Sequence, residues 1–162
     1  PLKADLRYPQ RPKAFRNPQG RRCEDVRRIA GRGFQDRFVG RGLIAGDLDG
    51  DGDLDLVFSC NAGRPRVMRL DRPGTNAFLR VQPRQPGSKN REAIGARVHV
   101  TSGKTTQRQV VRTGGSYLSQ GALALTFGLG SAQDAHVEVI WPDGTKQDCG
   151  RLKAGPHVVE RK

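Results

Sequence analysis

Apolar and polar residues alternate along most of the second half of the chain, which is the pattern of half-buried β-strands. Ala96, Val98 and Val100 fall on one face of such a strand. The same spacing returns in two later groups, Leu123, Leu125 and Phe127, and then Val137, Val139 and Trp141. Turn signals recur between these groups, and Pro142-Asp-Gly144 is typical of a tight turn. The pattern predicts an all-β fold, with a β-sandwich-like domain over residues 76–162.

Shorter runs complete this prediction. Further strands are expected at residues 78–82, 107–112, 146–150 and 157–161, with a polar loop at 83–90 and a domain boundary at 71–76. In the first half, the apolar runs 42–46 and 54–58 and the segment 66–70 are predicted as strands. Residues 24–30 are expected to form one helical turn with Val26 and Ile29 facing inward. Residues 1–22, rich in proline and basic residues, predict an extended and poorly ordered arm.

Five aspartates lie between the runs 42–46 and 54–58, and they are the strongest chemical signal in the sequence. They are Asp47, Asp49, Asp51, Asp53 and Asp55. Carboxylates this close repel one another unless a divalent cation lies among them. Ca²⁺ fits best because it accepts six to eight oxygen ligands in a flexible cage, whereas Mg²⁺ ranks second. Gly50 and Gly52 allow the loop to curl, and we expect Asp53 to supply a backbone carbonyl or lie at the rim while Asp55 closes the cage.

Two other interpretations of this loop were considered. An EF-hand has a bidentate Glu at the twelfth position, but Phe58 stands there, and the flanking runs are too short for EF-hand helices. The loop would otherwise be an acidic turn without a ligand, although one or two aspartates suffice for a turn. The sequence therefore favours a calcium loop between two strands.

Residues 40–58, Gly-Arg-Gly-Leu-Ile-Ala-Gly-Asp-Leu-Asp-Gly-Asp-Gly-Asp-Leu-Asp-Leu-Val-Phe, resemble an FG-GAP (VCBS-type) repeat, the blade unit of integrin-like β-propellers. The resemblance implies one partial propeller blade over residues 23–72. It also implies that Asp47, Asp49, Asp51 and Asp55 bind calcium, as the aspartate-rich loop does in those repeats.

A second resemblance covers the other half. Residues 88–98 (Ser-Lys-Asn-Arg-Glu-Ala-Ile-Gly-Ala-Arg-Val) resemble the signature that opens the ASPIC/UnbV domain, and three later motifs, at 117–120, 127–130 and 139–144, follow in the family's order. The chain departs from the signature at Glu92-Ala93, where the family usually has an acidic or polar residue followed by Gly. A blade followed by this domain resembles the cartilage acidic protein family and its bacterial relatives.

The net charge of +13 bears on partners and location. A basic surface attracts anionic partners, so we expect a protein or anionic glycan partner; nucleic acid is less favoured because no recognition motif is present. No segment is long and apolar enough to span a membrane. Calcium loops in the millimolar range favour an extracellular or periplasmic location. The chain begins without Met, so it is expected to be an excerpt or a processed product, which leaves open the loss of a targeting segment.

No catalytic constellation is expected. His99, His136 and His157 are predicted to be surface or edge histidines without a partner, and Ser116 lacks the spacing of a nucleophile elbow. The spacing of Cys23, Cys60 and Cys149 argues against zinc and leaves their disulfide state open. The leading hypothesis is a calcium-binding extracellular interaction module. The family resemblance also leaves open an accessory component of a bacterial natural-product enzyme.

Overall fold

The computed structural model describes residues 8–71 and 76–162, and the predicted all-β fold is confirmed. The strands are β1 (Phe15–Arg16), β2 (Glu24–Asp25), β3 (Gly40–Gly46), β4 (Asp55–Cys60), β5 (Arg66–Met68), β6 (Ala77–Arg84), β7 (Arg97–Ser102), β8 (Thr105–Val110), β9 (Leu125–Gly130), β10 (Asp134–Ile140), β11 (Lys146–Lys153) and β12 (Gly155–Glu160). Two short 3₁₀ turns, η1 (Pro18–Gly20) and η2 (Arg32–Phe34), are the helical elements of the described residues. The central part of the predicted boundary, 72–75, lies outside the described residues.

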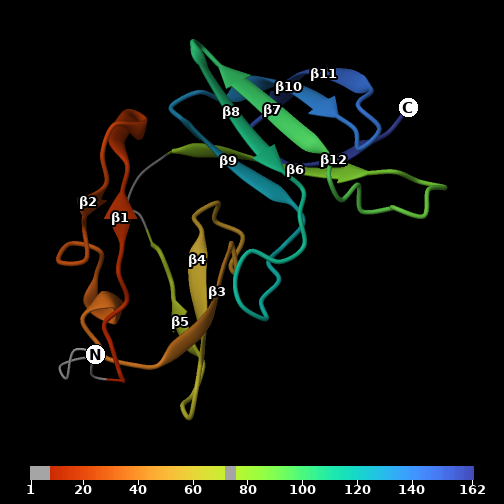
Figure 1. The fold of residues 1–162 in the computed structure, drawn as a ribbon. Coiled ribbons are helices and arrows are strands. Elements are labelled where there is room, and N and C mark those ends of the chain that lie inside the picture. Colours follow the sequence, from red (N-terminus) through yellow and green to blue (C-terminus); the bar gives the residue numbers. More distant parts are fainter. Residues whose placement is uncertain (1–7, 72–75) are drawn as a thin grey trace.

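The second half forms a sandwich of two sheets, which Figure 1 shows at the top of the molecule. One sheet has the strand order β11-β10-β7-β8 and the other the order β12-β6-β9, in which β12 runs parallel to β6. Side-chain amides bridge the seams between the sheets. Gln107 and Gln109 of β8 donate to carbonyls of β9, and Gln147 of β11 donates to a carbonyl of β12. These bonds satisfy edge carbonyls that strand pairing leaves open.

The core lies between these two sheets. The predicted inward residues are confirmed, because Ala96, Val98, Val100, Val137 and Val139 are fully buried. Their alternation with less buried neighbours follows the pleat of the strands. Strand β6 runs to Arg84, past the predicted start of a loop at 83. Pro83 is in register with Val159 of β12. It is accommodated because β6 pairs with β9 only as far as Val81, so on that edge no strand needs the N–H that Pro83 lacks.

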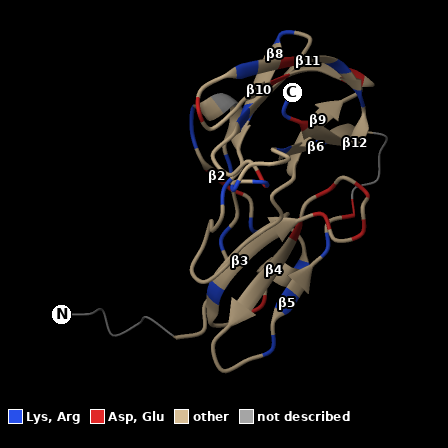
Figure 2. Cartoon of the chain, turned by 90° about the vertical axis from the view of Figure 1, so that its right-hand side faces the viewer, with Lys and Arg blue, Asp and Glu red and all other residues tan. Residues whose placement is uncertain are grey.

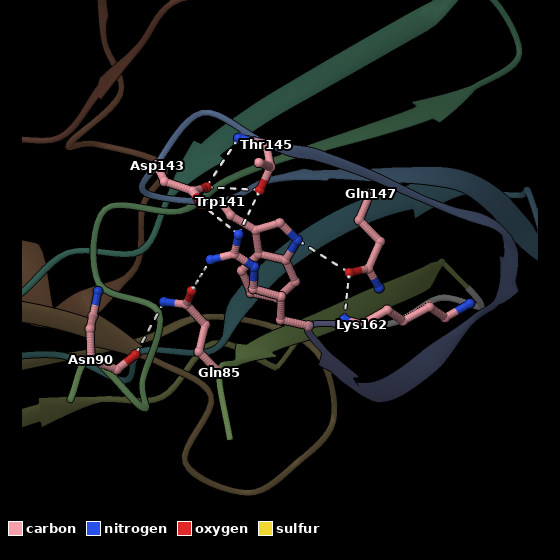
Figure 3. A network of polar contacts seen from close by, with 8 residues as sticks. Gln85, Asn90, Trp141, Asp143, Thr145, Gln147 and Lys162 are labelled. Atoms are coloured by element: carbon pink, nitrogen blue, oxygen red, sulfur yellow. Dashed lines mark hydrogen bonds and ion pairs between the residues drawn. The ribbon is translucent and has the colours of Figure 1, made fainter. Parts of the chain in front are cut away.

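A polar network closes the sandwich beside Trp141, as Figure 3 shows. Trp141 is 2% exposed, and its indole N–H donates to Gln147 at 3.2 Å. Arg161, near the C-terminus, donates to the carboxylate of Asp143 at 2.5 Å and to the side chain of Gln85 at 3.0 Å. These bonds fasten the end of the chain to the turn after Trp141 and to the end of β6.

The stability that the Asp143–Arg161 ion pair contributes should depend on pH, and this dependence can be measured. Hydrogen bonds from Arg161 and Thr145 lower the pKa of Asp143 from 3.8 to about 2. A depressed pKa means that Asp143 stabilises the fold above the unfolded value and loses this effect as the pH falls from about 4 to 2. We expect Asp143→Asn to lower the urea midpoint at pH 7 and to match the unchanged protein near pH 2. An equal difference at both pH values would contradict this assignment.

The first half forms a separate three-stranded antiparallel sheet with the order β3-β4-β5. The three strands predicted at 42–46, 54–58 and 66–70 are therefore present, with shifted ends. Phe38 and Phe58 pack edge to face on this sheet, with ring centroids 5.3 Å apart. Below the sandwich in Figure 1, β3 and β4 form a hairpin whose acidic loop points toward β6.

Two predictions for the N-terminal region were wrong. Residues 24–30 begin with the short strand β2, and Ile29 is 83% exposed instead of facing inward. The turn is nevertheless present, because the N–H of Ala30 donates to the carbonyl of Val26. The arm at 1–22 is also more structured than expected where it is described, since β1 pairs with β2; residues 1–7 lie outside the described residues. The pairing of β1 with β2 depends on backbone hydrogen bonds, and the pattern of apolar residues does not indicate these.

No helix in the described residues has the length and apolar character needed to cross a bilayer, which agrees with the prediction.

Candidate metal site

Strands β3 and β4 hold the aspartate loop at both ends. The last residue of β3, Gly46, pairs with the first residue of β4, Asp55, so the intervening residues must reverse the chain. Gly50 and Gly52 have φ angles of +84° and +93°, which is the left-handed region that favours glycine. Successive aspartate side chains accept backbone N–H groups from residues ahead of them, from Gly50 to Asp47 and from Asp53 to Asp51. These bonds curl the loop inward.

Three of the five predicted ligands converge in this loop. Carboxylate oxygens of Asp47, Asp49 and Asp51 all lie within 4.8 Å of one another. Oxygen ligands bind Ca²⁺ at about 2.3–2.6 Å, so two ligands of one ion lie no more than about 5 Å apart. The three oxygens therefore fit a single Ca²⁺, for which water or backbone carbonyls would supply the remaining ligands. Calcium binding at this loop stays a prediction.

Asp55 and Asp53 are placed differently from these three. The carboxylate of Asp55 is buried and accepts the N–H groups of Leu48 and Leu70, each at 2.9 Å. These two hydrogen bonds lower the pKa of Asp55. Asp55 thus fastens the base of the loop to the segment that follows β5, and it does not join the converging group. Asp53 donates its N–H to Asp51, and its carboxylate also lies outside that group.

Two residues of strand β6, in the sandwich, contact the loop. Arg80 makes an ion pair with Asp47, whose side chain is only 2% exposed. Phe78 lies against the backbone of Gly52 so closely that a Cβ at Gly52 would be 2.0 Å from the ring. Figure 2 shows the acidic loop between the β3–β4–β5 sheet and the strands β6 and β12. The loop therefore contacts both halves of the chain.

A cavity of about 760 Å³ lies next to the loop, between β3 and the sandwich. Asp47 and Arg80 belong to its lining, together with Arg108 and Arg112. Gly114 and Gly115, from the segment after β8, also line it, and this segment is bonded to β3 because the N–H of Leu43 donates to the Ser116 hydroxyl at 3.1 Å. This cavity was not predictable from the sequence, because its lining comes from segments that are far apart in the chain.

The histidines are not isolated, contrary to the prediction. His99 lies 3.5 Å from the carboxylate of Glu138, and His136 lies 2.9 Å from that of Asp148. His157 contacts the carbonyl of Lys153. Each partner comes from the neighbouring strand or turn, so strand pairing explains contacts that sequence spacing did not show. The three cysteines are free thiols.

These observations define an all-β protein in which a sandwich adjoins a three-stranded sheet with an aspartate-rich hairpin loop. Residues 86–159 match the family described as ASPIC and UnbV, which confirms the resemblance of the second half. The chain is also 37% identical to cartilage acidic protein 1 from Mus musculus and from Homo sapiens, over 109 residues that make up 65% of this chain. It is 36% identical to the same protein from Xenopus tropicalis. The chain spans only about a sixth of the length of these relatives, 17% for the mouse protein and 16% for the human one.

Several residues in the segment that resembles the ASPIC/UnbV signature stabilise the local structure. The Asn90 side chain both donates to and accepts from the backbone of Ile94, which closes the turn before β7. Ala93, which stands where the family has Gly, has a φ of +50° and is fully buried. The backbone at this position thus keeps the conformation that favours glycine. Trp141 anchors the core, as the sequence predicted.

Proposed function

We propose that this chain is part of an extracellular calcium-binding interaction module in which an FG-GAP-type blade is joined to an ASPIC/UnbV domain. The observation that carries the proposal is the convergence of the Asp47, Asp49 and Asp51 carboxylates at the end of a β-hairpin. The antiparallel β3-β4-β5 sheet supports the comparison with a propeller blade, although a complete propeller contains several blades. The similarity to cartilage acidic protein 1 covers 109 residues, so it extends beyond the residues 86–159 that match ASPIC and UnbV.

In this proposal the ion has a structural role. It would neutralise carboxylates that repel one another and would stiffen a loop that packs on Phe78 and Arg80 of β6. Binding at the loop would thereby hold the blade against the sandwich. An extracellular location supplies calcium at the concentration that weakly binding loops need. The net charge of +13 supports a role in binding an anionic partner, a protein or an anionic glycan.

Thermal unfolding with and without calcium tests the metal part of this proposal. At a calcium concentration tenfold above the dissociation constant, binding adds about 1.4 kcal/mol to the stability. For a chain of this size, we expect a rise in Tm of about 3–6 °C relative to protein in chelator. Magnesium at the same concentration should give a smaller rise. An unchanged Tm at 10 mM calcium would refute calcium binding.

Replacement of Arg80 tests whether its positive charge, on β6 of the sandwich, weakens calcium binding at the loop. The guanidinium of Arg80 neutralises Asp47 in the absence of an ion, and it would repel a divalent cation bound there. We therefore expect Arg80→Gln to strengthen calcium binding about threefold to tenfold in a calorimetric titration. Arg80→Lys retains the charge and serves as the control, with affinity close to that of the unchanged protein. Weaker calcium binding in Arg80→Gln would contradict this role.

A further inference from the structure

The cavity between β3 and the sandwich combines two kinds of surface. Its lining includes the aliphatic side chains of Leu43, Leu54 and Leu56 of the blade and of Leu125 of the sandwich. The same lining includes Arg108 at β8 and Arg112 just after it. A volume of about 760 Å³ lies within the usual range of about 300–1,000 Å³ for ligand sites. The cavity is therefore large enough for a few amino-acid side chains.

The arginines leave an excess of positive charge in this cavity. Arg80 and Asp47 also line it, but they form an ion pair, and Asp47 additionally accepts the N–H groups of Gly50 and Gly52. Across residues 8–71 and 76–162, neither Arg108 nor Arg112 has a carboxylate within ion-pair distance. Both are exposed and available to a ligand. Guanidinium groups bind carboxylates through paired hydrogen bonds, which makes a carboxylate the matching group.

The side chains that line the cavity favour an acidic peptide over a nucleic acid or an anionic saccharide. The lining contains no aromatic side chain, whereas single-stranded nucleic acids are held largely by stacking on aromatic rings. Its aliphatic side chains would desolvate the hydroxyl groups of a saccharide without hydrogen-bonding them, which is unfavourable. An aliphatic side chain beside a carboxylate suits both surfaces at once.

We propose that this cavity binds an acidic peptide segment, with its carboxylates on Arg108 and Arg112 and an adjacent aliphatic side chain against Leu43, Leu54 and Leu56. This inference rests on the partner role in the proposed function and names the partner's chemistry and the place where it binds. It does not require that calcium occupy the loop.

Fluorescence anisotropy with the labelled peptide Gly-Leu-Glu-Glu-Leu-Gly tests the inference on the full 162-residue chain. We expect Arg108→Gln combined with Arg112→Gln to weaken binding at least tenfold. The matched control, Arg28→Gln combined with Arg64→Gln, removes two exposed charges that do not line the cavity and should change the affinity less than twofold. Peptides with Gln in place of Glu, or Ser in place of Leu, should also bind at least tenfold more weakly.

Equal losses in the two double variants, or no measurable binding of the peptide, would overturn the inference. So would tighter binding of a sulfated hexasaccharide or a DNA oligonucleotide at the same two arginines. The shift in Tm with calcium is measured on the same samples. If the calcium shift persists while peptide binding fails, only this inference is refuted; if peptide binding persists without a calcium shift, only the metal part of the proposed function is refuted.

Discussion

Gly52→Ala is expected to destabilise the protein by about 3 kcal/mol and to lower Tm by about 6–12 °C. Two effects combine at this position. The φ of +93° is strained for any residue with a Cβ, which costs about 1 kcal/mol. The new Cβ would also lie 2.0 Å from the Phe78 ring, so either the ring or the loop must move. Thermal unfolding in chelator measures the change independently of calcium.

Gly50→Ala is the matched control for this prediction. Gly50 has a similar φ of +84° in the same loop, but no atom lies within 4 Å of the position of its Cβ. Only the backbone strain should therefore appear, with a loss of about 1 kcal/mol. If both variants lose the same stability, then the loop does not pack on Phe78 and the described contact with β6 is wrong.

The second large effect is expected from Asp49→Asn combined with Asp51→Asn. Calcium affinity depends strongly on the number of carboxylate ligands, and this change removes two of the three that converge. We expect the affinity measured by calorimetry to fall at least about 100-fold. The two residues are exposed, so the variant should fold as the unchanged protein does in chelator.

The control for this variant is Asp36→Asn combined with Glu160→Gln, which removes the same amount of negative charge at exposed positions outside the loop. Its calcium affinity should change less than threefold. A comparable loss in both double variants would show that calcium responds to the overall charge of the protein and not to this loop.

The sequence predicted the strands well because their apolar residues alternate with the period of the pleat. Val98, Val100, Val137 and Val139 were identified as core residues, and all are fully buried. The ends of strands were harder to predict, as Pro83 shows, because they depend on which neighbour each strand has. Ile29 was misplaced for a similar reason, since a short apolar segment does not reveal which face it presents.

The aspartate loop was also only partly predictable. The spacing of Asp47, Asp49 and Asp51 was enough to place them together, since alternate residues of a curled loop face one centre. The role of Asp55 was not predictable, because its partner Leu70 lies 15 positions away, just beyond the end of β5. The contact of Arg80 with Asp47 joins residues 33 positions apart and depends on how the two halves of the chain pack.

A crystal structure determined in 10 mM calcium would test the central claim most directly. The account predicts one ion within about 2.3–2.6 Å of carboxylate oxygens from Asp47, Asp49 and Asp51, identified by its anomalous scattering. Asp55 should remain bonded to the N–H groups of Leu48 and Leu70. A loop that contains only water at this calcium concentration, with the three carboxylates turned apart, would contradict the account.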